Sequence, residues 1–256
     1  MTKMPMMFAG HGSPMNAIED NRYTRGWKEM VKDVPKPKAI ISISAHWYTK
    51  GTKIMNEDNP KTIYDMYGFP QKLYEIVYSP PGSPALAAEA KRLISKESVF
   101  DNSWGIDHGT WSVLVHMYPE RDIPVFQISI DALAPPEVHY RIGMELKQFR
   151  EQGVLLFGTG NIVHNLKLVN WGMGDNGFDW AHRFDAFIKE NIMSGNHDNI
   201  INYQSLGETA KLAVPITDHF NPILYILGAA DKDDKITVYN DSCVMGSLSM
   251  TSYLFE

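Results

Sequence analysis

Residues 38–46 read KAIISISAH, a run of β-branched and small residues that ends in a histidine. Short apolar runs bounded by proline or glycine are typical of buried strands. Three other segments share this character: PMMFAG at 5–10, PVFQISID at 124–131 and GVLLFGTG at 153–160. The segment KITVYND at 235–241 is predicted as a late strand, and a Gly/Ser-rich tail follows it.

Helical patterns separate these strands. Trp27, Met30 and Val31 recur at helical spacing within 21–34, and Ser83 followed by Pro84 is a typical helix start. Further helices are predicted at 83–95, 111–117, 140–151 and 179–193, and 223–230 is either a helix or a strand. This alternation predicts an α/β fold, with a central mixed β-sheet flanked by helices on both faces. No repeat or composition shift marks a boundary, so we expect a single domain over residues 1–256.

Composition narrows the class of partner. The 256 residues carry a net charge of −6 without a Lys/Arg-rich run, which disfavours nucleic acid as a partner. No segment approaches eighteen apolar residues, so we expect no membrane association and a soluble, cytoplasmic protein. The single cysteine, Cys243, excludes an intrachain disulfide framework and fits a reducing compartment. The sequence does not fix the oligomeric state, and a homodimer is compatible with it.

Five of the nine histidines follow or interrupt strand-like runs in segments spread over the whole chain. These segments are GHGS at His11, SAHW at His46, DHGTW at His108, GNIVHN at His164 and TDHFNP at His219. Imidazole is the commonest metal ligand, and it titrates near neutral pH. Convergence of these side chains predicts a metal centre that has its own proton carrier.

Each histidine also has a simpler structural interpretation. His46 lies at the carboxyl end of a strand, where open α/β sheets place ligands, but it could equally be a buried core histidine. His108 and His219 each follow an aspartate that either orients the ring or caps a helix. The loop before His164 half resembles a dinucleotide-binding turn, but Val163 replaces its third glycine. The other four histidines, His116, His139, His182 and His197, are interpreted as surface or interhelical residues.

The stretch 48–78 has little periodicity and is rich in Asn, Asp, Tyr, Pro and Gly, so it is predicted to be a long functional loop. Aromatic side chains there and elsewhere are candidates for walling a substrate pocket. The candidates are Tyr64, Tyr67, Phe69, Trp111 and Phe220.

Six motifs in order carry a family resemblance. They are MPMMFAGHGSPMNAIEDN at 4–21, SAHW at 44–47, IYDMYGFPQKLYEIVYSPPGSP at 63–84, GIDHGTW at 105–111, GTGNIVHNL at 158–166 and DHFNPILYILGA at 218–229. The chain resembles the 4,5-DOPA extradiol dioxygenase family, a branch of the class III extradiol ring-cleaving dioxygenases that includes the catalytic subunit of protocatechuate 4,5-dioxygenase. The resemblance implies a single catalytic domain that opens a catechol ring with O2, with DOPA or a related catecholic acid as substrate.

The resemblance also assigns roles to residues. His11, His46 and His219 correspond to metal ligands. His164 corresponds to the acid/base histidine, and the alternative is that it is a fourth metal ligand. His108 is expected to hydrogen-bond oxygen or substrate. The resemblance implies Fe(II) for activity. The wider class uses a carboxylate as third ligand, whereas His219 stands here as in the DOPA branch, and this departure makes Zn(II) the other candidate metal.

Two alternatives come from other classes. A zinc hydrolase would use the same histidines to lower the pKa of a bound water, and it would be active without oxygen. A binding module without enzymatic activity would use the histidines for core hydrogen bonds, and it would hold no metal.

Overall fold

The computed structural model describes residues 3–256, and its centre is an eight-stranded sheet with the order β4-β3-β5-β2-β6-β1-β10-β7. The strands are β1 (Met6–Gly10), β2 (Ala39–Thr49), β3 (Thr52–Ile54), β4 (Ser98–Phe100), β5 (Val125–Asp131), β6 (Val154–Gly160), β7 (Ile236–Tyr239) and β10 (Ser252–Phe255). A separate pair is formed by β8 (Cys243–Val244) and β9 (Leu248–Ser249).

The middle of the sheet is parallel. Strand β6 pairs in parallel with both β1 and β2, and β2 pairs in parallel with β5. Every residue of β1, β5 and β6 is buried, which explains their continuous apolar runs. Because β1, β2 and β6 run the same way, their carboxyl ends lie together at one edge of the sheet. The antiparallel pairs β1–β10, β10–β7 and β3–β5 make the sheet mixed, as predicted.

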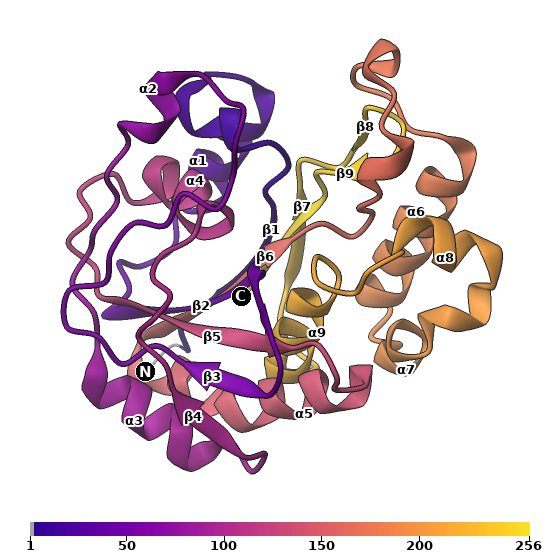
Figure 1. Cartoon of the computed structure of the whole chain (residues 1–256). Helices are drawn as coiled ribbons and strands as arrows, with labels where there is room; N and C mark the ends of the chain where they lie inside the picture. The colour runs from indigo at the N-terminus through magenta and orange to yellow at the C-terminus, as the bar shows by residue number, and fades with distance from the viewer. Residues whose placement is uncertain (1–2) are drawn as a thin grey trace.

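Helices cover both faces of this sheet (Figure 1). On one side α4 (His108–Met117) packs against β2 and β6, with α1 (Arg22–Met30) beside it. On the other side α9 (Asn221–Ala229) packs against β1, β2 and β6, and α5 (Pro136–Leu146) packs on α9. The remaining helices are α2 (Gln71–Tyr74), α3 (Pro84–Leu93), α6 (Asp179–Met193), α7 (His197–Ile201) and α8 (Glu208–Ala213). The predicted α/β class, with helices on both faces, is confirmed.

Several local predictions need correction. Strand β2 does not end at His46 but runs to Thr49. The helix expected at 111–117 begins at His108, because Asp107 caps it by accepting a hydrogen bond from the Thr110 amide. The segment 223–230, for which helix and strand were both open, is helical as far as Ala229, and β8, β9 and β10 follow β7 where a Gly/Ser-rich tail was expected. None of the helices in the described part of the chain combines the length and apolar character that crossing a membrane requires.

Candidate metal centre

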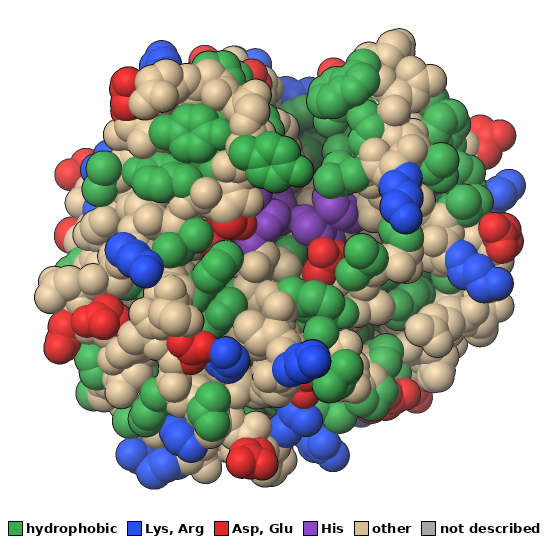
Figure 2. All heavy atoms as spheres, viewed as in Figure 1, with side chains coloured by type: hydrophobic (Ala, Val, Ile, Leu, Met, Phe, Trp, Pro, Cys, Tyr) green, Lys and Arg blue, Asp and Glu red, His purple; other side chains and the backbone are tan. Residues whose placement is uncertain are grey.

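The structure brings together the five histidines singled out from the sequence, and in Figure 2 histidine side chains line the floor of a cleft between two halves of the surface. The rings of His46 and His108 have centroids 3.8 Å apart, and the His11 centroid lies 5.0 Å from that of His46. The His219 ring lies 5.2 Å from His11, and His164 stacks on His219 at 3.4 Å with an interplanar angle of 8°. Segments separated by up to 208 residues therefore build one site.

The parallel strand ends position two of these rings. His11 directly follows β1, and its amide donates a hydrogen bond to the Gly160 carbonyl at the end of β6. The His219 carbonyl accepts from the Asn161 amide at 2.9 Å, so the loop before α9 lies directly on the end of β6. A Cβ at position 160 would overlap the His219 carbonyl oxygen, so this approach requires glycine.

An irregularity in β2 accompanies His46. Between Ile43 and Tyr48 the register against β5 shifts, because β2 advances from partner Ile128 to partner Ile130 over five of its own residues. Such bulges re-aim side chains near functional sites. The His46 ring then lies against Gly109, where an added Cβ would come within 2.6 Å of its Cδ2 atom. The glycine of the DHGTW motif is therefore needed for the close packing of His46 beside α4.

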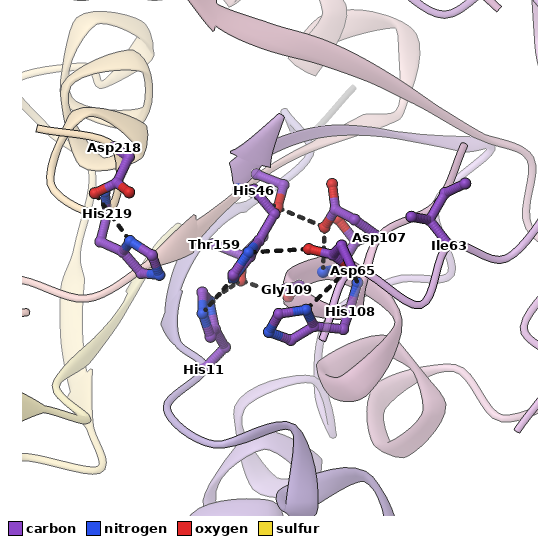
Figure 3. Close-up of polar contacts among 12 residues, drawn as sticks. His11, His46, Ile63, Asp65, Asp107, His108, Gly109, Thr159, Asp218 and His219 are labelled. Atoms are coloured by element: carbon purple, nitrogen blue, oxygen red, sulfur yellow. Dashed lines mark hydrogen bonds and ion pairs between the residues drawn. The ribbon is translucent and has the colours of Figure 1, made fainter. Parts of the chain in front are cut away.

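His108 is placed by the start of α4 and by two aspartates. Asp107 is fully buried and accepts hydrogen bonds from Ser44 Oγ, Trp104 Nε1 and Gln127 Nε2, as well as from the Thr110 amide. Asp65 Oδ1 accepts from the His108 amide at 3.0 Å. Figure 3 shows Asp65 between the rings of His46 and His108. The turn before α4 is thus held by two carboxylates, the buried Asp107 and the partly buried Asp65.

Hydrogen bonds determine which nitrogen of His11 carries its proton. Thr159 Oγ1 donates to the Gly109 carbonyl at 2.7 Å, so it accepts from His11 Nδ1, which lies 3.0 Å away. His11 is therefore protonated at Nδ1, and its Nε2 lone pair faces His46 Nε2 at 3.1 Å. Two imidazole nitrogens this close require either a hydrogen atom or a metal ion between them, because two lone pairs would repel each other.

The pKa values of the five histidines show which of their rings can carry a positive charge. Burial and the neighbouring histidines hold the pKa of His11 and of His219 well below the usual value, so both rings are neutral at neutral pH. Burial also lowers the pKa of His108, and it lowers that of His164 to about 4. His46 differs: burial opposes its charge, but the contact with Asp65 and the nearby carboxylates raise its pKa. The site therefore accepts one positive charge next to His46.

The donor set fits a single metal ion. Nitrogens of His11, His46 and His219 all lie within 4.8 Å of one another. The 3.1 Å between the Nε2 atoms of His11 and His46 is less than twice a metal–imidazole bond of about 2.1 Å, so one cation can contact both. Nδ1 of His46 lies 3.0 Å from Asp65 Oδ2, and Nδ1 of His219 lies 3.0 Å from Asp218 Oδ1. Carboxylates behind ligand histidines are common at metal sites.

The aromatic candidates differ in their exposure. Tyr64 and Phe69 are partly buried, and Tyr67 is 92% exposed. Trp111 and Phe220 are fully buried, with Trp111 Nε1 donating to the Ile63 carbonyl and the Phe220 ring packed 4.4 Å from that of Tyr203. These two residues offer no exposed surface to a ligand in this structure.

Sequence reasoning missed Asp65, which contacts both His46 and His108. The stretch expected as one long loop, 48–78, contains the end of β2 together with β3 and α2, and Asp65 lies in the irregular segment between β3 and α2. Periodicity carries no information there, and an acid among the aromatic residues of IYDMYGFP was the only signal. His139 is buried between α5 and α9, where its Nδ1 lies 3.0 Å from the Tyr225 hydroxyl, so its interhelical interpretation is confirmed.

Fold and site together define a class: an α/β protein with a histidine-rich centre able to hold a metal ion at the carboxyl ends of parallel strands. The family model described as "Catalytic LigB subunit of aromatic ring-opening dioxygenase" matches residues 2–256. The chain belongs to this family, whose extradiol dioxygenases are metal-dependent and use O2 with a small-molecule substrate.

Individual relatives agree with the family match. The chain is 43% identical to "4,5-DOPA dioxygenase extradiol" of Escherichia coli (strain K12), over 98% of this chain and 94% of that protein. It is 36% identical to the protein of the same name from Beta vulgaris, over 97% and 95% of the two chains. A crystal structure of an uncharacterized protein from Escherichia coli K12 superposes with a TM-score of 0.87, at 39% identity, covering 99% of this chain and 100% of the other. These findings identify the enzyme class as extradiol ring-cleaving dioxygenase.

Proposed function

We propose that residues 1–256 act as one catalytic domain that opens the ring of a catecholic acid such as DOPA by 4,5-cleavage, with His11, His46 and His219 holding Fe(II). The observation that carries the ligand assignment is the pair of Nε2 atoms 3.1 Å apart, one of which must bear a lone pair because Thr159 fixes its tautomer. The names of the bacterial and plant relatives support DOPA as the substrate. Zn(II) is the competing metal, because a set of three imidazoles also suits zinc.

When bound, Fe(II) would supply open positions for the two catechol oxygens and for O2, and a route for electrons between them. The protein's own residues then manage protons. The pKa of His164 is lowered to about 4 by burial, so its ring is neutral at neutral pH and has a free lone pair, but it is a weak base that would take a proton only from a catechol hydroxyl made more acidic by the metal. The same low pKa makes the protonated ring a strong acid, which returns the proton readily when an oxygen atom of the ring-opening reaction needs it.

The other side chains orient and surround the substrate. His108 is also neutral, because burial lowers its pKa, and we assign it a hydrogen bond to oxygen or substrate. Tyr64, Tyr67 and Phe69 lie between β3 and α2 and have the exposed surface to form a pocket wall. The buried ring of Trp111 lies 6.1 Å from that of Tyr64 and supports this wall, whereas Phe220 is buried against Tyr203. The cytoplasmic location and a homodimeric assembly stay predictions.

Anaerobic loading with Fe(II) tests this function. The loaded protein is mixed with air-saturated buffer containing DOPA, protocatechuate or caffeate, and oxygen uptake and the yellow absorbance of the ring-opened product are recorded. We expect one O2 consumed per catechol opened, with DOPA preferred. Hydrolysis of ester or amide substrates without oxygen, by the Zn(II)-loaded protein, would favour the hydrolase instead.

A further inference from the structure

We propose that Asp65 is a positioning residue that keeps the proton of His46 on Nδ1, so that Nε2 is free to bind the metal. This inference deepens the proposed function, because it rests on His46 as a ligand. It adds a residue outside the metal-ligand and proton-carrier sets, one that acts through another side chain.

The two carboxylate oxygens of Asp65 contact different residues. Oδ2 lies 3.0 Å from His46 Nδ1, on the side of the ring opposite the Nε2 atom that faces His11. Oδ1 accepts the backbone amide of His108 at 3.0 Å. His108 Nδ1 also lies 3.0 Å from Oδ1, but it is not aligned for a hydrogen bond. One carboxylate therefore connects a metal ligand to the first turn of α4.

The surroundings keep this carboxylate ionised. Burial opposes the charge of Asp65, whose side chain is only 11% exposed, but the His108 amide donates to Oδ1 and the Nδ1 atoms of His46 and His108 each lie 3.0 Å from one of its oxygens, so groups that stabilise a negative charge surround it. A carboxylate can only accept hydrogen bonds, so an imidazole nitrogen 3.0 Å from Oδ2 must carry a hydrogen atom. Proton placement on His46 thus follows from the chemistry of its partner, in the same way as Thr159 places the proton of His11.

Substitution of Asp65 by Asn makes a specific prediction about one ring. The His108 amide needs an acceptor, so the new amide oxygen takes the Oδ1 position and the NH2 group faces His46 Nδ1. An NH2 group is a donor, so His46 Nδ1 must now present a lone pair, and the neutral ring then carries its proton on Nε2. A proton on Nε2 must leave before a metal can bind there, which weakens metal binding although the size of the side chain at position 65 hardly changes.

The test uses the full chain with 15N-labelled histidine, free of metal, and two-dimensional NMR that distinguishes protonated from unprotonated ring nitrogens. The His46 signals are assigned by their loss in His46→Gln. We expect a protonated Nδ1 in the unsubstituted chain and an unprotonated Nδ1 in Asp65→Asn. The matched control is Asp58→Asn, which removes an exposed carboxylate from the same loop and should leave every histidine signal unchanged.

Metal affinity supplies the second readout. Titration calorimetry with Co(II) should show about 10–100-fold weaker binding to Asp65→Asn, the usual effect of losing a partner behind a ligand histidine, and no change in Asp58→Asn. If Asp65→Asn does not fold, the unsubstituted chain still decides: an unprotonated His46 Nδ1 there overturns the inference.

The two proposals fail separately. An oxygen-consuming enzyme whose His46 signals are the same in Asp65→Asn would overturn the role of Asp65 and leave the proposed function standing. A shifted His46 proton in a chain that consumes no oxygen with any catechol would support the role of Asp65 and overturn the proposed function.

Discussion

Replacing His164 by Phe separates a proton carrier from a metal ligand. His164 stacks on His219 at 3.4 Å with nearly parallel rings, and a Phe ring preserves this stack while it removes both nitrogens. If His164 only moves protons, the variant keeps the metal and loses ring opening. If His164 is a ligand, the variant loses the metal as His46→Ala does.

The expected sizes of the two effects differ widely. General acid–base catalysis by one positioned side chain contributes about 10²–10⁴-fold in rate, equivalent to about 3–5 kcal/mol in the activation barrier. The aromatic stack on His219 is worth about 0.5–1.5 kcal/mol. His164→Ala, which loses the stack, should therefore weaken metal binding by about tenfold at most, and His164→Phe should weaken it less.

The assay has two arms on the same preparations. Metal content after Fe(II) loading and gel filtration is measured by mass spectrometry, and oxygen uptake is measured with DOPA at saturation. We expect near-stoichiometric metal and a loss of at least about 100-fold in kcat for His164→Phe. Metal loss in His164→Phe equal to that in His46→Ala would refute the reasoning and reassign His164 as a fourth ligand.

Three further predictions concern the frame around the site. Burial lowers the pKa of His139 from 6.5 to about 4, so the unfolded chain binds a proton at this ring more tightly than the folded chain does. The free energy of unfolding should therefore fall by about 3 kcal/mol as the pH falls from 6.5 to 4. In urea unfolding, the difference between the unsubstituted chain and His139→Gln should follow this pH dependence, and a pH-independent difference would contradict it. Arg150→Met should cost about 3–5 kcal/mol, because Arg150 is 1% exposed and pairs with Asp234 through two contacts of 2.7 Å; a change in thermal unfolding below 1 kcal/mol would show that the pair is dispensable. Gly160→Ala should displace the His219 carbonyl and lower both Co(II) affinity and stability, the latter by about 1–3 kcal/mol, and unchanged Co(II) binding by calorimetry would refute the argument for glycine.

The sequence predicts the parallel centre of the sheet well, because those strands are buried on both faces and read as uninterrupted apolar runs. It fails at short strands whose partners are distant in sequence. Strand β10 has four residues and follows a Gly/Ser-rich stretch, and its pairing with β1 spans almost the whole chain. The end of β2 was placed too early, because the register shift around His46 depends on β5 and leaves no local signal.

The sequence also predicts some residues of the candidate site and misses others. The five histidines were found because each lies in a short motif with glycine, aspartate or an aromatic residue beside it, and the structure gathers all five. Asp65 was not found, because its role depends on two rings brought to it from β2 and α4. Trp111 and Phe220 were also candidates for the pocket wall, but both are fully buried, and this burial depends on packing partners such as Tyr64 and Tyr203 that are distant in the sequence.

The position of β10 between β1 and β7 has a consequence for biosynthesis. His11 leaves the ribosome long before residues 252–255 do, yet β1, which positions it, gains its second neighbour in the sheet only after those residues have emerged. Until then one edge of β1 is exposed and can pair with other chains. We therefore expect the metal to be loaded after synthesis of the chain has passed β10, and chaperones that shield unpaired strands to influence the yield of active enzyme.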